Sequence, residues 1–207
     1  MIAIVDYGAG NLRSVQKALQ FIGAPCEITA DAQKIAKAPG VILPGVGSFG
    51  DCMEAMRRRA LVEPVQSAAR EAMEGKRPFL GICLGLQLLF GASAESPGAQ
   101  GLGVLPGHAE KLPFGPGLKV PHIGWNSISL LQRGGIFAGL PDGAYVYFVH
   151  SYCVRAEEEA DVAARAAYGT VFDAACMRGL LSATQFHPEK SGETGLLMLQ
   201  NFAEMAK

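Results

Sequence analysis

Residues 77–91 read RPFLGICLGLQLLFG and form the most informative stretch of the chain. No charged residue occurs from Pro78 to Ala94, and Cys83 lies within this run with a glycine two residues away on each side. A membrane-spanning helix needs about 20 consecutive apolar residues, whereas this run is interrupted by a proline, a glutamine and several glycines. We therefore interpret the stretch as a strand buried in protein that turns directly into a helix, with the cysteine at the junction.

The junction has the form G-x-C-x-G, which is the nucleophile-elbow pattern with sulfur in place of oxygen. The flanking Gly81 and Gly85 permit a strained turn and leave room for a substrate to approach. The N-terminus of the following helix favours a thiolate, and the N–H of Leu84 would point at an oxyanion formed by attack of the sulfur. A small buried core residue is the alternative role for Cys83, and the spacing by itself leaves both roles open.

Strand-like and helix-like segments alternate through the first half of the chain. Such alternation implies βαβ units and a mainly parallel sheet. The hydrophobic patterns predict strands at residues 1–8, 26–29, 40–45 and 78–83, and helices at 11–22, 51–74 and 84–91.

The second half consists of strand-like runs joined by short polar or glycine-containing turns, which indicates antiparallel pairing. The predicted fold is therefore α/β, with a mostly parallel central sheet flanked by helices and an antiparallel C-terminal portion. We expect residues 1–207 to form a single domain, because neither an internal repeat nor a linker is evident. The runs lie at 145–154, 161–168, 171–178 and 180–189, a final helix at 194–206, and loop with short edge structure at 93–118.

Composition narrows the functional classes. A net charge of −1 gives no clustered basic surface for nucleic acid or an anionic membrane. The N-terminus lacks the basic region and cleavage site of a signal peptide, and an odd number of cysteines without a CxxC pair fits a reducing cytoplasm. No group of side chains has metal-ligand spacing, so we expect no metal and no cofactor. The four cysteines outside the elbow are expected to be structural: Cys26, Cys52, Cys153 and Cys176.

A thiol nucleophile needs a base, and the base needs a group that orients it. Of the four histidines, only His187 has a carboxylate at a suitable offset, in TQFHPEKS. Residues two apart on a strand point to the same side, so Glu189 can reach one ring nitrogen and leave the other to face Cys83. A solvated strand end is the alternative interpretation of this pair.

Two glycine-rich loops follow predicted strands. DYGAGNLRS, residues 6–14, resembles a dinucleotide fingerprint, but Arg13 occupies its third glycine position, which argues against nucleotide binding. LPGVGSFG, residues 43–50, lacks the lysine of a P-loop. Its backbone N–H groups could serve as a second oxyanion donor, or the segment could be a plain turn.

Taken together, GICLGLQ (81–87), LPGVGSFG and FHPE (186–189) resemble the class I, or triad, glutamine amidotransferases. Within that family the chain looks most like the glutaminase subunits of imidazole glycerol phosphate synthases. The resemblance runs from the first strand to the last helix, and Leu86 and Ser48 are mild variations. The strings that carry the closer likeness are IVDYGAGNLRSV, PHIGWN, YFVHSY and QFHPEKS.

The resemblance implies a role for each matching residue. Cys83 would attack the side-chain amide of glutamine, His187 would shuttle protons, and Glu189 would hold the imidazole. The resulting thioester would then be hydrolysed to glutamate. The oxyanion would be stabilised by the backbone of Gly45, Val46, Gly47 and Leu84, and the glutamine would be bound by Gly47, Gln87, Ser151 and Tyr152.

The resemblance also implies a partner, a (β/α)₈-barrel cyclase that would receive the ammonia and close an imidazole ring in histidine biosynthesis. A stand-alone thiol hydrolase resembling γ-glutamyl hydrolases, a glutaminase subunit of another synthase and a non-catalytic binding subunit are the alternatives. The residues whose motifs would face the partner are Asn11, His122, Trp125, Tyr147 and Lys190.

Overall fold

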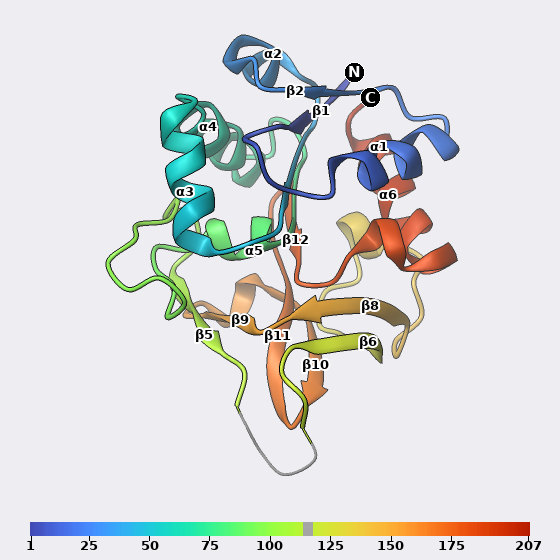
Figure 1. Ribbon diagram of the computed structural model, residues 1–207. Helices are drawn as coiled ribbons and strands as arrows, with labels where there is room; N and C mark the ends of the chain where they lie inside the picture. Colours follow the sequence, from blue (N-terminus) through green and yellow to red (C-terminus); the bar gives the residue numbers. More distant parts are fainter. Residues whose placement is uncertain (114–117) are drawn as a thin grey trace.

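The computed structural model describes residues 1–113 and 118–207, and its centre is a ten-stranded sheet (Figure 1). One half of this sheet is parallel and the other half is antiparallel. The path through it runs β2 (Cys26–Thr29), β1 (Ile2–Val5), β3 (Val41–Gly45), β4 (Phe79–Cys83), β12 (Leu181–Thr184), β11 (Thr170–Arg178), β10 (Val162–Tyr168) and β7 (Ser129–Leu130).

The central strands of the parallel half are buried on both faces, which is why they read as continuous apolar runs. Alternate residues of β1 point to opposite faces of the sheet and join different hydrophobic cores. Ile2 and Ile4 belong to the core on the first face, and Ala3 and Val5 belong to the core on the second face. Helices α1 (Leu12–Phe21) and α6 (Gly192–Met205) cover the first face. Helices α2 (Ala32–Lys37), α3 (Phe49–Arg58) and α4 (Val62–Met73) cover the second.

The second half of the chain differs from the prediction in several respects, the first of them at residues 145–154. The run at residues 145–154 is not one strand, because it divides at Ser151 into β8 (Tyr145–His150) and β9 (Tyr152–Ala156). Strand β9 joins the main sheet beside β11, whereas β8 pairs with β6 (His122–Ser127) in a separate two-stranded sheet. The predicted loop at 93–118 contains an edge strand, β5 (Gly107–Lys111), and its residues 114–117 lie outside the described residues.

The arrangement brings two distant segments to one edge of the sheet. Strands β4 and β12 are parallel neighbours, with Ile82 opposite Thr184. Their carboxyl ends therefore meet at the same edge, where open α/β sheets bind ligands. The short helix α5 (Leu84–Leu88) follows β4 there, and the 3₁₀ turn η3 (Pro188–Lys190) follows β12.

Among the described residues, no helix combines the length and the apolar character that crossing a bilayer requires. The described residues also include the 3₁₀ turns η1 (Gly135–Phe137) and η2 (Glu159–Asp161).

Candidate active site

Cys83 is held on a strained turn between β4 and α5. Its backbone has φ 56° and ψ −109°, a conformation that L-residues rarely adopt and that costs on the order of 1–3 kcal/mol. The flanking glycines make the turn possible: a Cβ on Gly85 would lie 1.9 Å from the carbonyl oxygen of Leu43, and one on Gly81 would lie 2.9 Å from that of Gly85. The G-x-C-x-G spacing therefore reflects backbone packing as well as strain.

His187 and Glu189 form a buried pair after β12. Glu189 Oε1 lies 2.8 Å from His187 Nδ1, and the two side chains are 0% and 3% exposed. The backbone N–H of His187 donates to the carbonyl of Tyr147 at 2.9 Å, which fixes the histidine against β8. Within the described part of the chain, the Nε2 atom of His187 has no hydrogen-bond partner, so this nitrogen is available to the cavity.

The expected contact between these two residues is present, but the strand geometry predicted for it is wrong. Strand β12 ends at Thr184, and Pro188–Lys190 form a 3₁₀ turn. Because Pro188 begins this turn, the chain curls and carries the Glu189 carboxylate back over the imidazole.

Charge around His187 favours its protonated form. Burial by itself lowers the pKa of the imidazole, but the neighbouring Cys83 and Glu189 raise it more, to about 9. A proton on this ring is therefore stabilised by the sulfur on one side and the carboxylate on the other. This is the electrostatic arrangement that a thiolate–imidazolium pair requires.

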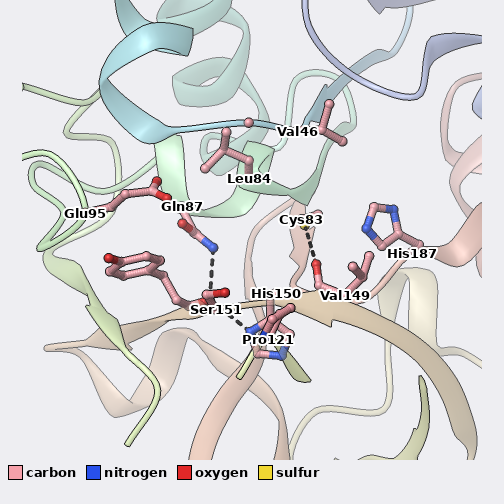
Figure 2. Close-up of a pocket in the computed structure, with 12 residues that line it drawn as sticks. Val46, Cys83, Leu84, Gln87, Glu95, Pro121, Val149, His150, Ser151 and His187 are labelled. Atoms are coloured by element: carbon pink, nitrogen blue, oxygen red, sulfur yellow. Dashed lines mark hydrogen bonds between the residues drawn. The ribbon is translucent and has the colours of Figure 1, made fainter. Parts of the chain in front are cut away.

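Cys83 lies in a cavity of about 290 Å³ (Figure 2). Its Sγ is 3.8 Å from the carbonyl oxygen of Val149, toward which the thiol donates, and 3.7 Å from Nε2 of Gln185, from which it accepts. The cavity is lined by Val46, Gly47, Cys83, Leu84, Gln87, Glu95, Pro121, Val149, His150, Ser151, Tyr152 and His187.

The glycine-rich segment after β3 borders this cavity. Gly45 is opposite Cys83 in the β3–β4 register, and a Cβ on it would lie 2.8 Å from the Gly85 nitrogen. Gly47 has φ +101°, and Val46 is 43% exposed. Within residues 1–113 and 118–207, no hydrogen bond is donated by the N–H of Val46 or of Gly47. These N–H groups are therefore unoccupied donors beside the thiol.

All four residues expected to bind glutamine line the cavity, and the structure adds another. Gln87 donates from Nε2 to the Tyr152 carbonyl at 3.1 Å. Glu95, which was not predicted, places a carboxylate in the cavity and is fixed by accepting the Phe49 N–H at 2.8 Å. One signal for it exists in the sequence, because it is the first charge after the uncharged run.

The residues expected to face a partner do not form a single group. Trp125 and Tyr147 pair across β6 and β8 with ring centroids 6.1 Å apart, and Lys190 Nζ lies 5.8 Å from the Tyr147 ring. His122 differs from this expectation, because its side chain is buried between the rings of Phe148 and Tyr168. Asn11 precedes α1 and lines a different hollow.

The four other cysteines sit in environments that disfavour a thiolate. Burial raises the pKa of Cys26, Cys52 and Cys176, and it raises that of Cys153 to about 12. None of the five cysteines, all within the described residues, forms a disulfide.

Comparison with known proteins agrees with this geometry. The profile of the family described as "Glutamine amidotransferase class-I" matches residues 3–206. The chain is 50% identical to "Imidazole glycerol phosphate synthase subunit HisH" of Moorella thermoacetica, with 100% of this chain and 95% of that protein covered. It is 48% identical to the protein of the same name from Geobacter metallireducens, with 98% and 97% covered.

Solved structures share the fold at lower identity. "Crystal structure of glutamine amidotransferase" has a TM-score of 0.75 at 21% identity, and it covers 100% of this chain and 99% of that chain. "Structure of PurLQS from Thermotoga maritima" has a TM-score of 0.74 at 21% identity, with 100% and 98% covered. With a family match from residue 3 to residue 206 and two relatives near 50% identity, the chain belongs to the class I glutamine amidotransferase family.

Proposed function

We propose that the chain is the glutaminase subunit of an imidazole glycerol phosphate synthase, which hydrolyses glutamine and delivers ammonia to a partner cyclase. The relatives that carry this name match the chain over almost its whole length. The observation that carries the chemistry is the Glu189-held imidazole of His187, whose free Nε2 faces the cavity of the Cys83 elbow.

The first half-reaction forms a thioester. The Cys83 proton passes to Nε2 of His187, and the sulfur attacks the side-chain amide carbon of glutamine. The carbonyl electrons move to oxygen, where the N–H groups of Leu84, Val46 and Gly47 can donate hydrogen bonds. When the oxyanion collapses, the C–N bond breaks, and His187 returns its proton to the leaving nitrogen, which departs as ammonia.

The second half-reaction consumes the thioester. His187, now neutral, takes a proton from water as the water oxygen attacks the thioester carbon. The C–S bond then breaks, glutamate forms, and the proton returns to Cys83. Glu189 keeps its hydrogen bond to Nδ1 throughout, so it fixes the orientation of the ring and stabilises the imidazolium.

Substrate recognition follows from the charges of glutamine. The α-ammonium group pairs with the Glu95 carboxylate, the single acidic side chain among the cavity-lining residues. Gln87 can also contribute to substrate binding as a hydrogen-bond acceptor, because its Oε1 is buried and has no hydrogen-bond partner in the described residues. Ser151, Tyr152 and Gly47 complete the polar lining that holds the remaining groups of the amino acid.

We further propose that the partner is a (β/α)₈-barrel cyclase in a reducing cytoplasm. It would use the ammonia to form imidazole glycerol phosphate and aminoimidazole carboxamide ribotide. Trp125 is exposed on β6, Tyr147 is half-buried beside it on β8, and Lys190 of η3 lies over the Tyr147 ring. Together they form an aromatic and basic surface that suits a stable contact.

The test is covalent labelling followed by synthesis. A diazo-ketone analogue of glutamine should label one thiol, and peptide mapping should identify Cys83. The Cys83→Ala enzyme, assembled with the cyclase, should lose glutamine-dependent synthesis and keep synthesis from added ammonia. A label on Cys52 or Cys153 would overturn the nucleophile assignment. Full glutamine hydrolysis by the chain alone, unchanged by the cyclase, would favour a stand-alone hydrolase.

A further inference from the structure

A chain of hydrogen bonds runs through the protein from His122 to the wall of the cavity. Nδ1 of His122 lies 3.0 Å from Nε2 of His150, and Nδ1 of His150 lies 2.9 Å from the carbonyl oxygen of Tyr152. That oxygen can only accept, so Nδ1 of His150 carries a proton. Burial lowers the pKa of His122 to about 4 and that of His150 to about 3, so both rings are neutral at pH 7. His122 therefore donates to His150.

The same carbonyl fixes the orientation of two buried amides. Gln87 Nε2 lies 3.1 Å from the Tyr152 oxygen and 3.1 Å from Oε1 of Gln185, so its two hydrogens are directed to these two acceptors. Because Oε1 of Gln185 accepts from Gln87, its amide nitrogen faces the other way. That nitrogen lies 3.7 Å from the sulfur of Cys83. The direction of the whole chain is set by one backbone carbonyl, and its last donor points at the nucleophile.

We propose that Gln185 is a further catalytic residue, whose side-chain N–H donates to the sulfur of Cys83 and stabilises the thiolate that attacks the substrate. Its role in turnover rests on the proposed function, whereas the hydrogen bond to the sulfur does not. Gln185 is 0% exposed, and its backbone N–H is anchored to the Ala174 carbonyl at 2.8 Å. The donor is therefore held in place before substrate arrives.

The two hydrogen-bond partners of the Cys83 sulfur stabilise opposite protonation states. The Val149 carbonyl accepts from the thiol, so it stabilises the protonated form. The Gln185 amide donates, so it gains strength when the sulfur becomes negative, because hydrogen bonds to ions are the stronger kind. An amide neither gains nor loses a proton near neutral pH, so it assists the thiolate without competing with His187 for the proton.

The experiment measures alkylation of Cys83 by iodoacetamide as a function of pH, with the modified peptide quantified by mass spectrometry. Gln185→Met and Gln185→Leu have different shapes and share the loss of the amide. In both, the midpoint of the rate should move up by about one to two pH units, which corresponds to about 10- to 100-fold slower alkylation on the acid side.

Thr184→Val is the matched control. Thr184 is also fully buried, adjoins Gln185 in the chain, and donates its hydroxyl to the Phe186 carbonyl at 2.9 Å. Its loss should leave the alkylation midpoint unchanged. The other titratable groups around the thiol are present in all the proteins compared, so their effects on the alkylation midpoint cancel in the comparison. These groups are His187, His150, Glu95 and Tyr7.

A midpoint that stays in place in both Gln185 variants would overturn the inference, and so would an equal shift in Thr184→Val. If a variant fails to fold, NMR of the unsubstituted protein serves instead: the chemical shift of the Gln185 side-chain amide should change as the Cys83 thiol ionises. An amide shift that stays constant through this ionisation would also overturn the inference. Alkylation needs neither glutamine nor the cyclase, so a missing glutaminase activity would count against the proposed function alone.

Discussion

The proton on His187 depends on its two neighbours. Because Cys83 raises the pKa of the imidazole, Cys83→Ser, which replaces the thiol by a hydroxyl that stays neutral, should lower it from about 9. NMR titration of the ring carbons would measure the change. An unchanged titration would mean that the sulfur and the imidazole do not interact in solution. His108→Gln, a substitution of a histidine outside the site, should leave the His187 titration as it is.

The same raised pKa has a consequence for stability. The folded protein binds the His187 proton more tightly than the unfolded chain does, so this stabilisation is complete below about pH 6.5. It is lost as the pH rises through about 9. The contribution of this residue therefore lies on the neutral and acid side, where the enzyme holds its imidazolium.

Glu189 acts on the reaction through the imidazole. Glu189→Gln should keep the fold but lower glutamine turnover by about 10²–10⁴, the scale seen when the orienting carboxylate of a triad is lost. The neutral amide orients the ring less well and stabilises its cation poorly. Glu193→Gln, an exposed acid in the first turn of α6, is the control and should retain full turnover. Steady-state kinetics on both variants decide the matter, since normal turnover in Glu189→Gln would remove it from the mechanism.

At the scale of elements, the turn around Cys83 is the least tolerant part of the fold. Gly85→Ala places a methyl group 1.9 Å from the Leu43 carbonyl oxygen, in backbone that cannot move aside. The free energy of unfolding should fall by about 3 kcal/mol, the upper part of the range for overpacked cores. Urea denaturation would measure it. Gly91→Ala, where nothing lies within 4 Å of the added carbon, should change stability far less.

The parallel half of the sheet was predictable from the sequence because its strands are continuous apolar runs bounded by turns. Helix α2 was missed, since its six residues bury only Ile35 and show no sustained period. Strand β6 was also missed: its large apolar residues, Ile123 and Trp125, lie on the exposed face, so the short sequence gives no sign of a buried apolar face.

The site was predictable where a residue type identifies its own chemistry, and less so where the chemistry depends on an assembled environment. A cysteine between glycines and a histidine near a glutamate can be recognised in the linear sequence. Glu95 and Gln185 are ordinary polar residues until the fold places Glu95 in the wall of the cavity and Gln185, at the end of β12, against the sulfur of Cys83.

At the scale of the whole molecule, the glycine-rich segment after β3, which would supply the oxyanion donors, is fixed by one hydrogen bond at Pro44 and another at Val46. Tyr7 donates to the Pro44 carbonyl at 2.9 Å, and the Cys52 thiol donates to the Val46 carbonyl at 3.4 Å. A rotation of the Gly45–Val46 peptide between these anchors would change which group faces the oxyanion. We expect the partner and its ligand to favour the competent orientation, because one lost donor costs about 10²–10³ in rate.

The effect of the partner on the glycine-rich segment can be tested most directly at Lys190. This residue follows the triad directly and is exposed beside Tyr147. Lys190→Ala should lower the ligand-stimulated rate or the affinity for the cyclase, while labelling of Cys83 by an electrophile is kept. Lys76→Ala, near the amino end of β4 at the opposite edge of the sheet, should change neither. Equal hydrolysis rates for the chain alone, with cyclase, and with cyclase plus ligand would end the gating hypothesis.

The position of β4 between β3 and β12 also matters while the protein is being made. Residues 84–180 must be translated after β4 before its second neighbour exists, which takes roughly 5–20 seconds at ordinary ribosome speeds. Through that interval a strand whose five residues are all destined for the interior has one open edge. Such edges pair readily with other chains. Nascent chains are therefore most prone to aggregation after β4 emerges, and chaperones that shield hydrophobic strands should act in this window.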